Sequence, residues 1–165
     1  MAFRHILAHG LFFAAVVNAY LFLVMVLLSP RVWGYTDFPQ AVKDKVPPQT
    51  KREWTLAALI AGPWILFVLA FPLFSAYSLK AALGGRIPFW TAFLDLAVLW
   101  LLTALVDLVI LDWLVVSRLT PRFVIIPGSE KADYRDLSEH YRGHAKGLGL
   151  IVLASLAAAA VVSFL

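Results

Sequence analysis

The chain has 165 residues, of which 62% are hydrophobic and 15% are charged, and its formal net charge is +4. Soluble domains are typically about half apolar and about a quarter charged, so this composition indicates an integral membrane protein. There is no cysteine, which excludes disulfides, thiolate metal sites and thiol catalysis.

Residues 6–28 form the first uncharged run. It is longer than the apolar part of a signal peptide and long enough to span a bilayer, so we expect an uncleaved spanning helix. In the connection that follows, Thr50 and Glu53 have the spacing of a helix capping box, with Thr50 as the N-cap. The second helix is therefore predicted to begin near Lys51.

The second predicted span covers residues 54–77 and contains Pro63 and Pro72. A proline inside a helix lacks the backbone N–H and frees a carbonyl one turn earlier. Such breaks are tolerated in lipid where neighbouring groups re-satisfy the freed backbone. We therefore expect other helices to bond to this one near its prolines.

The remaining elements are a third span over residues 87–116, an amphipathic helix over 130–146 and a last span over 147–165. Helically spaced apolar residues predict that the amphipathic helix lies at the membrane surface. The last span is rich in Ala, Gly and Ser, which let helices approach closely. The predicted fold is all-α: a single polytopic four-helix membrane bundle with a cytoplasmic amphipathic interfacial helix.

The basic residues are divided unequally between the two predicted sides. The side of both termini has three, Arg4, Lys80 and Arg86. The other side has eleven, namely Arg31, Lys43, Lys45, Lys51, Arg52, Arg118, Arg122, Lys131, Arg135, Arg142 and Lys146. Lys and Arg concentrate in cytoplasmic loops, so both termini are predicted outside and the long loops in the cytoplasm. The pair His5 and His9 then lies across the membrane from His140 and His144, which excludes one centre built from all four.

Two stretches carry a family resemblance: PRVWGYTDFPQAVKDKVPPQTKRE in the first long loop, and DLVILDWLVVSRLTPRFVIIPGSEKADYRDLSEHYRGHAKG between the third and fourth spans. With them the chain resembles an uncharacterised family of small four-span bacterial membrane proteins. The resemblance implies bacterial origin and the four-span layout, and it brings no function with it. The expected location is the inner membrane.

The intramembrane polar residues are the first functional candidates, because carboxylates are costly in lipid. They are Asp95, Asp107, Asp112 and Asn18. Asp107, nearest the bilayer centre, is either a proton or cation site or a structural acid bonded to Asn18. Five residues along an α-helix turn through about 140° from one face, so Asp107 and Asp112 are expected to point apart. Asp112 is expected to pair with Arg118 or Arg122, and Asp95 to bond near the outer end.

Asp136, His140 and His144 follow one another at intervals of four residues and are therefore expected on one helix face. Two such histidines and a carboxylate are a weak candidate for a metal or catalytic site. Without a surrounding HExxH pattern, a solvated polar stripe in which Asp136 pairs with His140 is the preferred interpretation, and no cofactor is predicted.

The expected partners are membrane lipids, because the basic residues lie beside apolar segments; nucleic acid is not expected. The candidates for binding anionic headgroups are Arg118, Arg122, Lys51, Arg52, Arg142 and Lys146. A homo-oligomer or a larger membrane complex is a further expectation. The sequence favours a non-enzymatic accessory or lipid- or partner-binding module that acts through its cytoplasmic loops. Two alternatives remain: a small ion- or proton-coupled transporter or channel that uses Asp107, and a lipid-modifying enzyme at the cytoplasmic face.

Overall fold

The structure, a computed structural model, describes residues 1–164 of the chain. It is 78% helical, and within these residues it contains no strand. Four helices are long and apolar enough to cross a membrane: α1 (Ala2–Leu27), α4 (Lys51–Ala82), α5 (Phe89–Val106) continued by η1 (Asp107–Leu119), and α6 (Ser138–Phe164). The predicted all-α class and the four helices of spanning length are confirmed.

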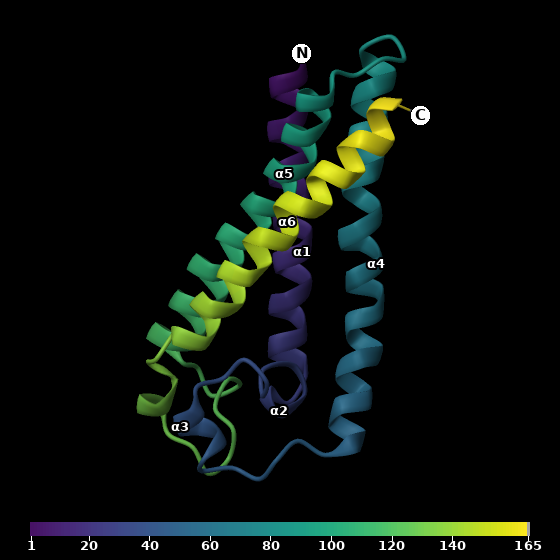
Figure 1. Ribbon diagram of the computed structural model, residues 1–165. Coiled ribbons are helices and arrows are strands. Elements are labelled where there is room, and N and C mark those ends of the chain that lie inside the picture. The colour runs from purple at the N-terminus through teal and green to yellow at the C-terminus, as the bar shows by residue number, and fades with distance from the viewer. Residues whose placement is uncertain (165) are drawn as a thin grey trace.

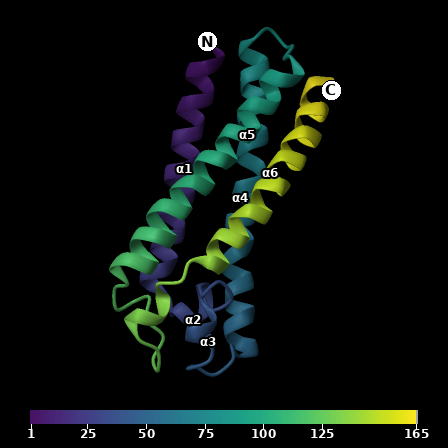
Figure 2. The same ribbon diagram turned by 60° about the vertical axis from the view of Figure 1, so that its left-hand side comes forward.

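The two ends of the bundle differ in structure. Both termini and the short connection after α4 lie at one end, and the two long connections lie at the other (Figure 1). Those connections contain the short helices α2 (Pro30–Trp33) and α3 (Gln40–Lys43), and the 3-10 turn η2 (Lys131–Tyr134). Figure 2 shows α6 running beside α5 along the bundle. The molecule is therefore an open bundle with a folded cap at one end.

The cap has its own apolar core, formed by the two long connections together with the ends of α1 and η1. Phe38 and Tyr134 are fully buried there, with their rings edge to face at a centroid distance of 5.0 Å. The Tyr134 hydroxyl accepts a hydrogen bond from the backbone N–H of Ile126 at 2.9 Å. Connections far apart in sequence are thus held as one unit.

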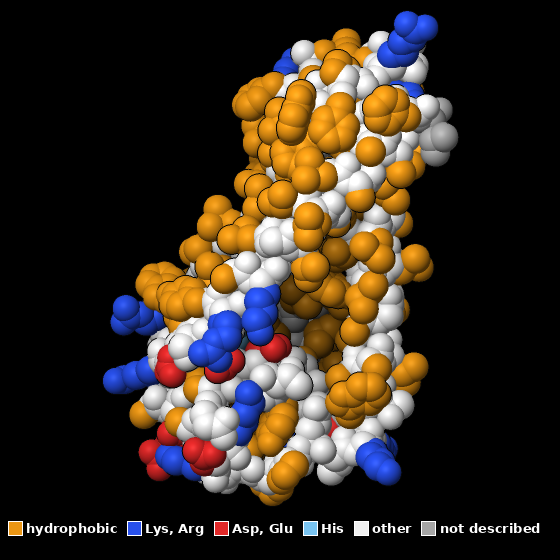
Figure 3. Space-filling model, viewed as in Figure 1, with side chains coloured by type: hydrophobic (Ala, Val, Ile, Leu, Met, Phe, Trp, Pro, Cys, Tyr) orange, Lys and Arg blue, Asp and Glu red, His pale blue; other side chains and the backbone are white. Residues whose placement is uncertain are grey.

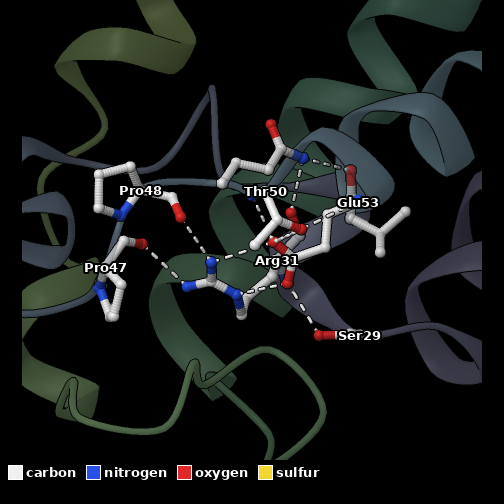
Figure 4. Close-up of polar contacts among 8 residues, drawn as sticks. Ser29, Arg31, Pro47, Pro48, Thr50 and Glu53 are labelled. Atoms are coloured by element: carbon white, nitrogen blue, oxygen red, sulfur yellow. Dashed lines mark hydrogen bonds and ion pairs between the residues drawn. The ribbon is translucent and has the colours of Figure 1, made fainter.

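Arg31 fastens this cap to the first turn of α4 (Figure 4). Its Nε donates to Glu53 Oε1 at 2.6 Å, and its Nη2 donates to Glu53 Oε2 at 3.1 Å. The same guanidinium donates to the carbonyls of Pro47 and Pro48. Glu53 also completes the capping box with Thr50, as the sequence predicts. A bidentate pair of this kind fixes orientation as well as distance.

The second half of α4 packs against the other helices, while its first half diverges from them. Its buried residues are Pro72, Ser75, Ala76 and Leu79. The indole Nε1 of Trp100 on α5 donates to the carbonyl of Val68 at 3.0 Å, which is the carbonyl freed by Pro72. The expectation that neighbours re-satisfy the proline breaks is confirmed at this position. Toward the cap, α4 separates from η1 (Figure 1).

Residues 130–146 do not form one interfacial helix. Residues 131–134 are the η2 turn, and α6 begins at Ser138 and continues without a break to Phe164. The fourth helix therefore includes His140 and His144 in its first turns, and the boundary expected at Gly147 does not exist. The last residue of the predicted span, at position 165, lies outside the described residues.

Candidate metal centre

The carboxylate of Asp112 lies between the two histidines of α6. Its Oδ1 is 2.9 Å from Nδ1 of His140, and its Oδ2 is 2.9 Å from Nε2 of His144. The expected pairing of Asp112 with Arg118 or Arg122 is wrong, because both of its oxygens face α6. His140 and His144 meet the same carboxylate because residues four apart share a face of an α-helix.

Asp107 joins this group because of the geometry of η1. The segment Asp107–Leu119 is a π-helix, in which hydrogen bonds join residues five apart. Residues 107 and 112 therefore lie about one turn apart on the same side of the helix. Asp107 Oδ2 is 3.7 Å from His144 Nε2. The prediction that the two aspartates point apart is wrong, because it assumed a regular α-helix. The π-helix has no sequence signal that could have shown this.

Asp136 does not belong to the cluster. It precedes α6, and its Oδ1 accepts a hydrogen bond from the backbone N–H of Ser138 at 2.9 Å. The expected pair of Asp136 with His140 is therefore wrong, since His140 turns to Asp112 instead. Asp136 therefore bonds to the backbone at the beginning of α6, and Asp112 is the carboxylate that pairs with His140.

Asp37 adds a further carboxylate from the first long connection, and no sequence pattern marks this residue as a candidate. Together with Asp107, Asp112, His140 and His144 it lines a cavity of about 370 Å³. The cavity admits solvent, but surrounding protein atoms desolvate the carboxyl and raise the pKa of Asp37 above its ordinary 3.8. Asp112 acts in the same direction, and His140 acts against it. A titratable group thus faces the cluster from the cap.

An apolar groove continues from this cavity between α1 and the first half of α4. The groove has a volume of about 420 Å³ and shares Leu21, Val24, Trp33, Asp37 and Trp64 with the cavity. Its other lining residues include Trp54, Ala57, Ile60 and Ala61 of α4. Figure 3 shows the hollow between α6 and α4, with charged side chains over the beginning of α6 at its edge. The cavity lined by the carboxylates and histidines therefore adjoins the apolar groove.

Three of these side chains offer donor atoms close enough together to hold one divalent metal ion. One ligand atom each from Asp107, Asp112 and His144 lies within 4.8 Å of the others. Ligands bonded to one ion at 2.0–2.2 Å lie roughly 3–3.5 Å apart, which is close to the 2.9 and 3.7 Å measured from His144 Nε2. Mixed imidazole and carboxylate ligands suit Zn²⁺, Mn²⁺ or Fe²⁺.

His140 supports the centre from beside it. Its Nδ1 bonds to Asp112, and its Nε2 is buried without a hydrogen-bond partner in residues 1–164. Carboxylates that ligate metals are themselves held by hydrogen bonds from outer groups. An imidazole oriented through Nδ1 also leaves Nε2 available to accept a proton.

The other intramembrane polar residues lie elsewhere. Asn18 donates to the carbonyls of Ala14 and Thr103, so its expected bond to Asp107 is wrong. Asp95 is fully buried and accepts from Ser75 near the end with the termini, where His5 and His9 also contact Ser75. The two histidine pairs therefore belong to separate clusters at opposite ends of the bundle, as expected.

The six headgroup candidates are all exposed, and the structure does not bring them into one site: Arg118, Arg122, Lys51, Arg52, Arg142 and Lys146. Arg118 lies over the Trp113 ring, 5.5 Å from its centroid, and Arg142 pairs with Glu139 at 2.7 Å. Two of them, Arg142 and Lys146, are on α6 in the same turns as His140 and His144. Neither of these two lines the cavity, because each lies two residues after a histidine and residues two apart on an α-helix face different sides.

Comparison of the chain with protein-family models, with curated proteins and with solved structures finds no match.

Proposed function

We propose that the protein is a membrane-embedded, metal-dependent enzyme that acts on the headgroup of an amphiphilic lipid. The observation that carries this proposal is the Asp112 carboxylate held between two histidines, with Asp107 within reach, at a cavity that continues into an apolar groove. Small-molecule sites are mostly apolar with a few convergent polar groups. Here the polar groups cluster at one end, which matches a molecule with a polar head and a hydrocarbon tail.

The roles of the side chains follow from their positions. Asp107, Asp112 and His144 would hold the ion, which would supply Lewis-acid polarisation of an ester or phosphoester oxygen. His140 accepts a proton at its free Nε2, because its Nδ1 is fixed by Asp112. Asp37, on the opposite wall, exchanges protons with the bound headgroup. The Trp64 indole N–H, which is buried without a partner among the described residues, donates to a headgroup oxygen.

The proposal places the protein in a bacterial inner membrane with both termini outside. The distribution of Lys and Arg supports this orientation, and it puts the cluster near the cytoplasmic interface. The groove then opens at the depth of lipid chains, and Arg142 and Lys146 lie at the level of headgroups. The sequence alone favours a non-enzymatic module. We prefer an enzyme because of the cluster of Asp107, Asp112, His140 and His144.

Turnover of lipids by the purified protein tests the proposal. The protein is placed in nanodiscs of bacterial phospholipids with Zn²⁺, Mn²⁺ or Fe²⁺, and products are followed by mass spectrometry. We expect a metal-dependent headgroup product that D107N and H144A abolish and that D136N retains, because Asp136 lies outside the cluster. Metal binding without turnover of any lipid would contradict the proposed enzymatic activity and would favour a binding module. Turnover that survives D107N and H144A would place the chemistry elsewhere.

A further inference from the structure

Asp95 lies in a second polar cluster, at the end of the bundle away from the proposed metal centre. Its side chain is fully buried, and Oδ1 accepts a hydrogen bond from Ser75 Oγ at 3.1 Å. Its Oδ2 has no hydrogen-bond partner in the described part of the chain. A buried carboxylate with an unpaired oxygen is expensive in an apolar environment, and one proton on the carboxylate removes the charge.

Ser75 connects Asp95 to two histidines of α1. Its Oγ is 2.9 Å from Nδ1 of His9 and 3.3 Å from Nε2 of His5. A hydroxyl has one hydrogen to donate, and that hydrogen is directed to Asp95, so His9 must donate from Nδ1. The Nε2 of His5 also lies 3.1 Å from the Ser75 carbonyl, which only accepts, so His5 donates as well. The hydrogen bonds from His9 to Ser75 and from Ser75 to Asp95 therefore point in one direction, toward the carboxylate, while His5 donates to the Ser75 main chain.

Among the described residues, no lysine or arginine forms an ion pair with Asp95. On α5, residues 89–106 include no other acidic or basic residue, and α6 has none over residues 147–164. Lys80 of α4 donates to the carbonyl of Val162 at 2.8 Å instead. On α1, Arg4 is exposed, and the side chains that contact Ser75 beside Asp95 are those of His5 and His9. The two rings lie against each other with centroids 3.8 Å apart and are only partly buried.

We propose that His5, His9, Ser75 and Asp95 form a proton-binding relay. It carries a proton from the end of the bundle where the termini lie to the Asp95 carboxyl, which is buried between the helices. In the inward step, the His9 imidazolium gives its Nδ1 proton to Ser75 Oγ while Ser75 gives its own proton to Asp95 Oδ1. The products are neutral His9, an unchanged Ser75 hydroxyl and a protonated Asp95. The reverse step restores the start, so atoms and charge balance without another reactant. The ligand of this site is the proton, and the relay does not depend on the metal centre.

Infrared titration of the full chain in nanodiscs tests the relay. We expect a carboxylic acid C=O band that appears as the pH falls, shifts when isotope-labelled aspartate is incorporated, and is lost in D95N. S75A removes the donor to the carboxylate, and H9N keeps a donor to Ser75 but cannot become charged. Both variants should move the midpoint of the band to higher pH. D136N, which lies outside both clusters, should leave band and midpoint unchanged.

Two results would overturn the proposal. A wild-type spectrum without a titrating aspartic acid band would show that Asp95 does not bind a proton. A band that D95N removes, but whose midpoint is the same in S75A and H9N as in the wild type, would show a buried acid that is not linked to the histidines. Circular dichroism establishes that each variant is folded, and the isotope shift in the wild-type chain needs no substitution.

Discussion

Asp107 and Asp112 are five residues apart and both turn toward Nε2 of His144, at 3.7 and 2.9 Å. The i to i+5 hydrogen bonds of η1 cause this alignment, because they place each residue over the fifth one after it. π-Helical segments are rare and frequent at functional sites. The change from α5 to η1 at Asp107 therefore coincides with the point at which the helix begins to carry the proposed ligands.

Trp100 and Pro72 can be tested as a compensating pair. W100F leaves the freed Val68 carbonyl without its donor, and we expect a loss of about 1–3 kcal/mol in the free energy of unfolding. P72A restores a backbone N–H one turn after Val68, so the double variant P72A/W100F should recover part of that loss. The free energy of unfolding of W100F, P72A and the double variant is measured in mixed micelles, with W90F, at an exposed tryptophan, as the control. Equal losses in W100F and the double variant would show that packing, and not the hydrogen bond, is the cause.

The parts of the structure that depend on local patterns could be predicted. The apolar runs gave the four spanning helices, and the spacing of Thr50 and Glu53 gave the beginning of α4, where the capping box is present. The separation of the two histidine pairs followed from chain topology. Each of these depends on residues close together in sequence or on the number of helices.

The cluster itself depends on tertiary contacts that no local pattern encodes. His140 and His144 were candidates, but their partner was expected at Asp136, on the same segment, and not at Asp112 on another helix. Asp37 lies in an irregular connection with no periodicity, and its position is set by packing of the cap. The continuous helix through residue 147 was missed because charged residues at the beginning of α6 resemble those of a surface helix.

Arg31 should stabilise the cap through its guanidinium geometry. R31K keeps the charge but cannot bond Glu53 at two atoms and the Pro47 and Pro48 carbonyls together. We expect a loss of about 1.5–3 kcal/mol in unfolding free energy and faster proteolysis between residues 34 and 49. R52K, at an exposed neighbouring position, is the control. Equal proteolysis of R31K and wild type would show that the apolar core of the cap is sufficient.

Asp37 gives stability a dependence on pH. Desolvation raises the pKa of Asp37 in the folded protein above the ordinary 3.8. Between pH 3.8 and this folded-state pKa, the folded state therefore binds more protons than the unfolded state. The contribution of Asp37 to stability therefore falls as the pH rises from below 3.8 through the folded-state pKa. The stability gain of D37N over wild type, measured with a chelator present, should grow over the same interval. D44N, a carboxylate of the same connection that does not line the cavity, is the control, and a gain in D37N that is independent of pH would contradict this account.

The metal content of the purified protein tests the central claim most directly. Elemental analysis after incubation with Zn²⁺, Mn²⁺ or Fe²⁺ and removal of free ion should give one ion per chain in the wild type and in D136N. D107N, D112N and H144A, folded by circular dichroism, should lose it. A wild-type protein with no bound ion, or an ion retained equally by these three variants, would contradict the assignment of Asp107, Asp112 and His144 as a metal centre.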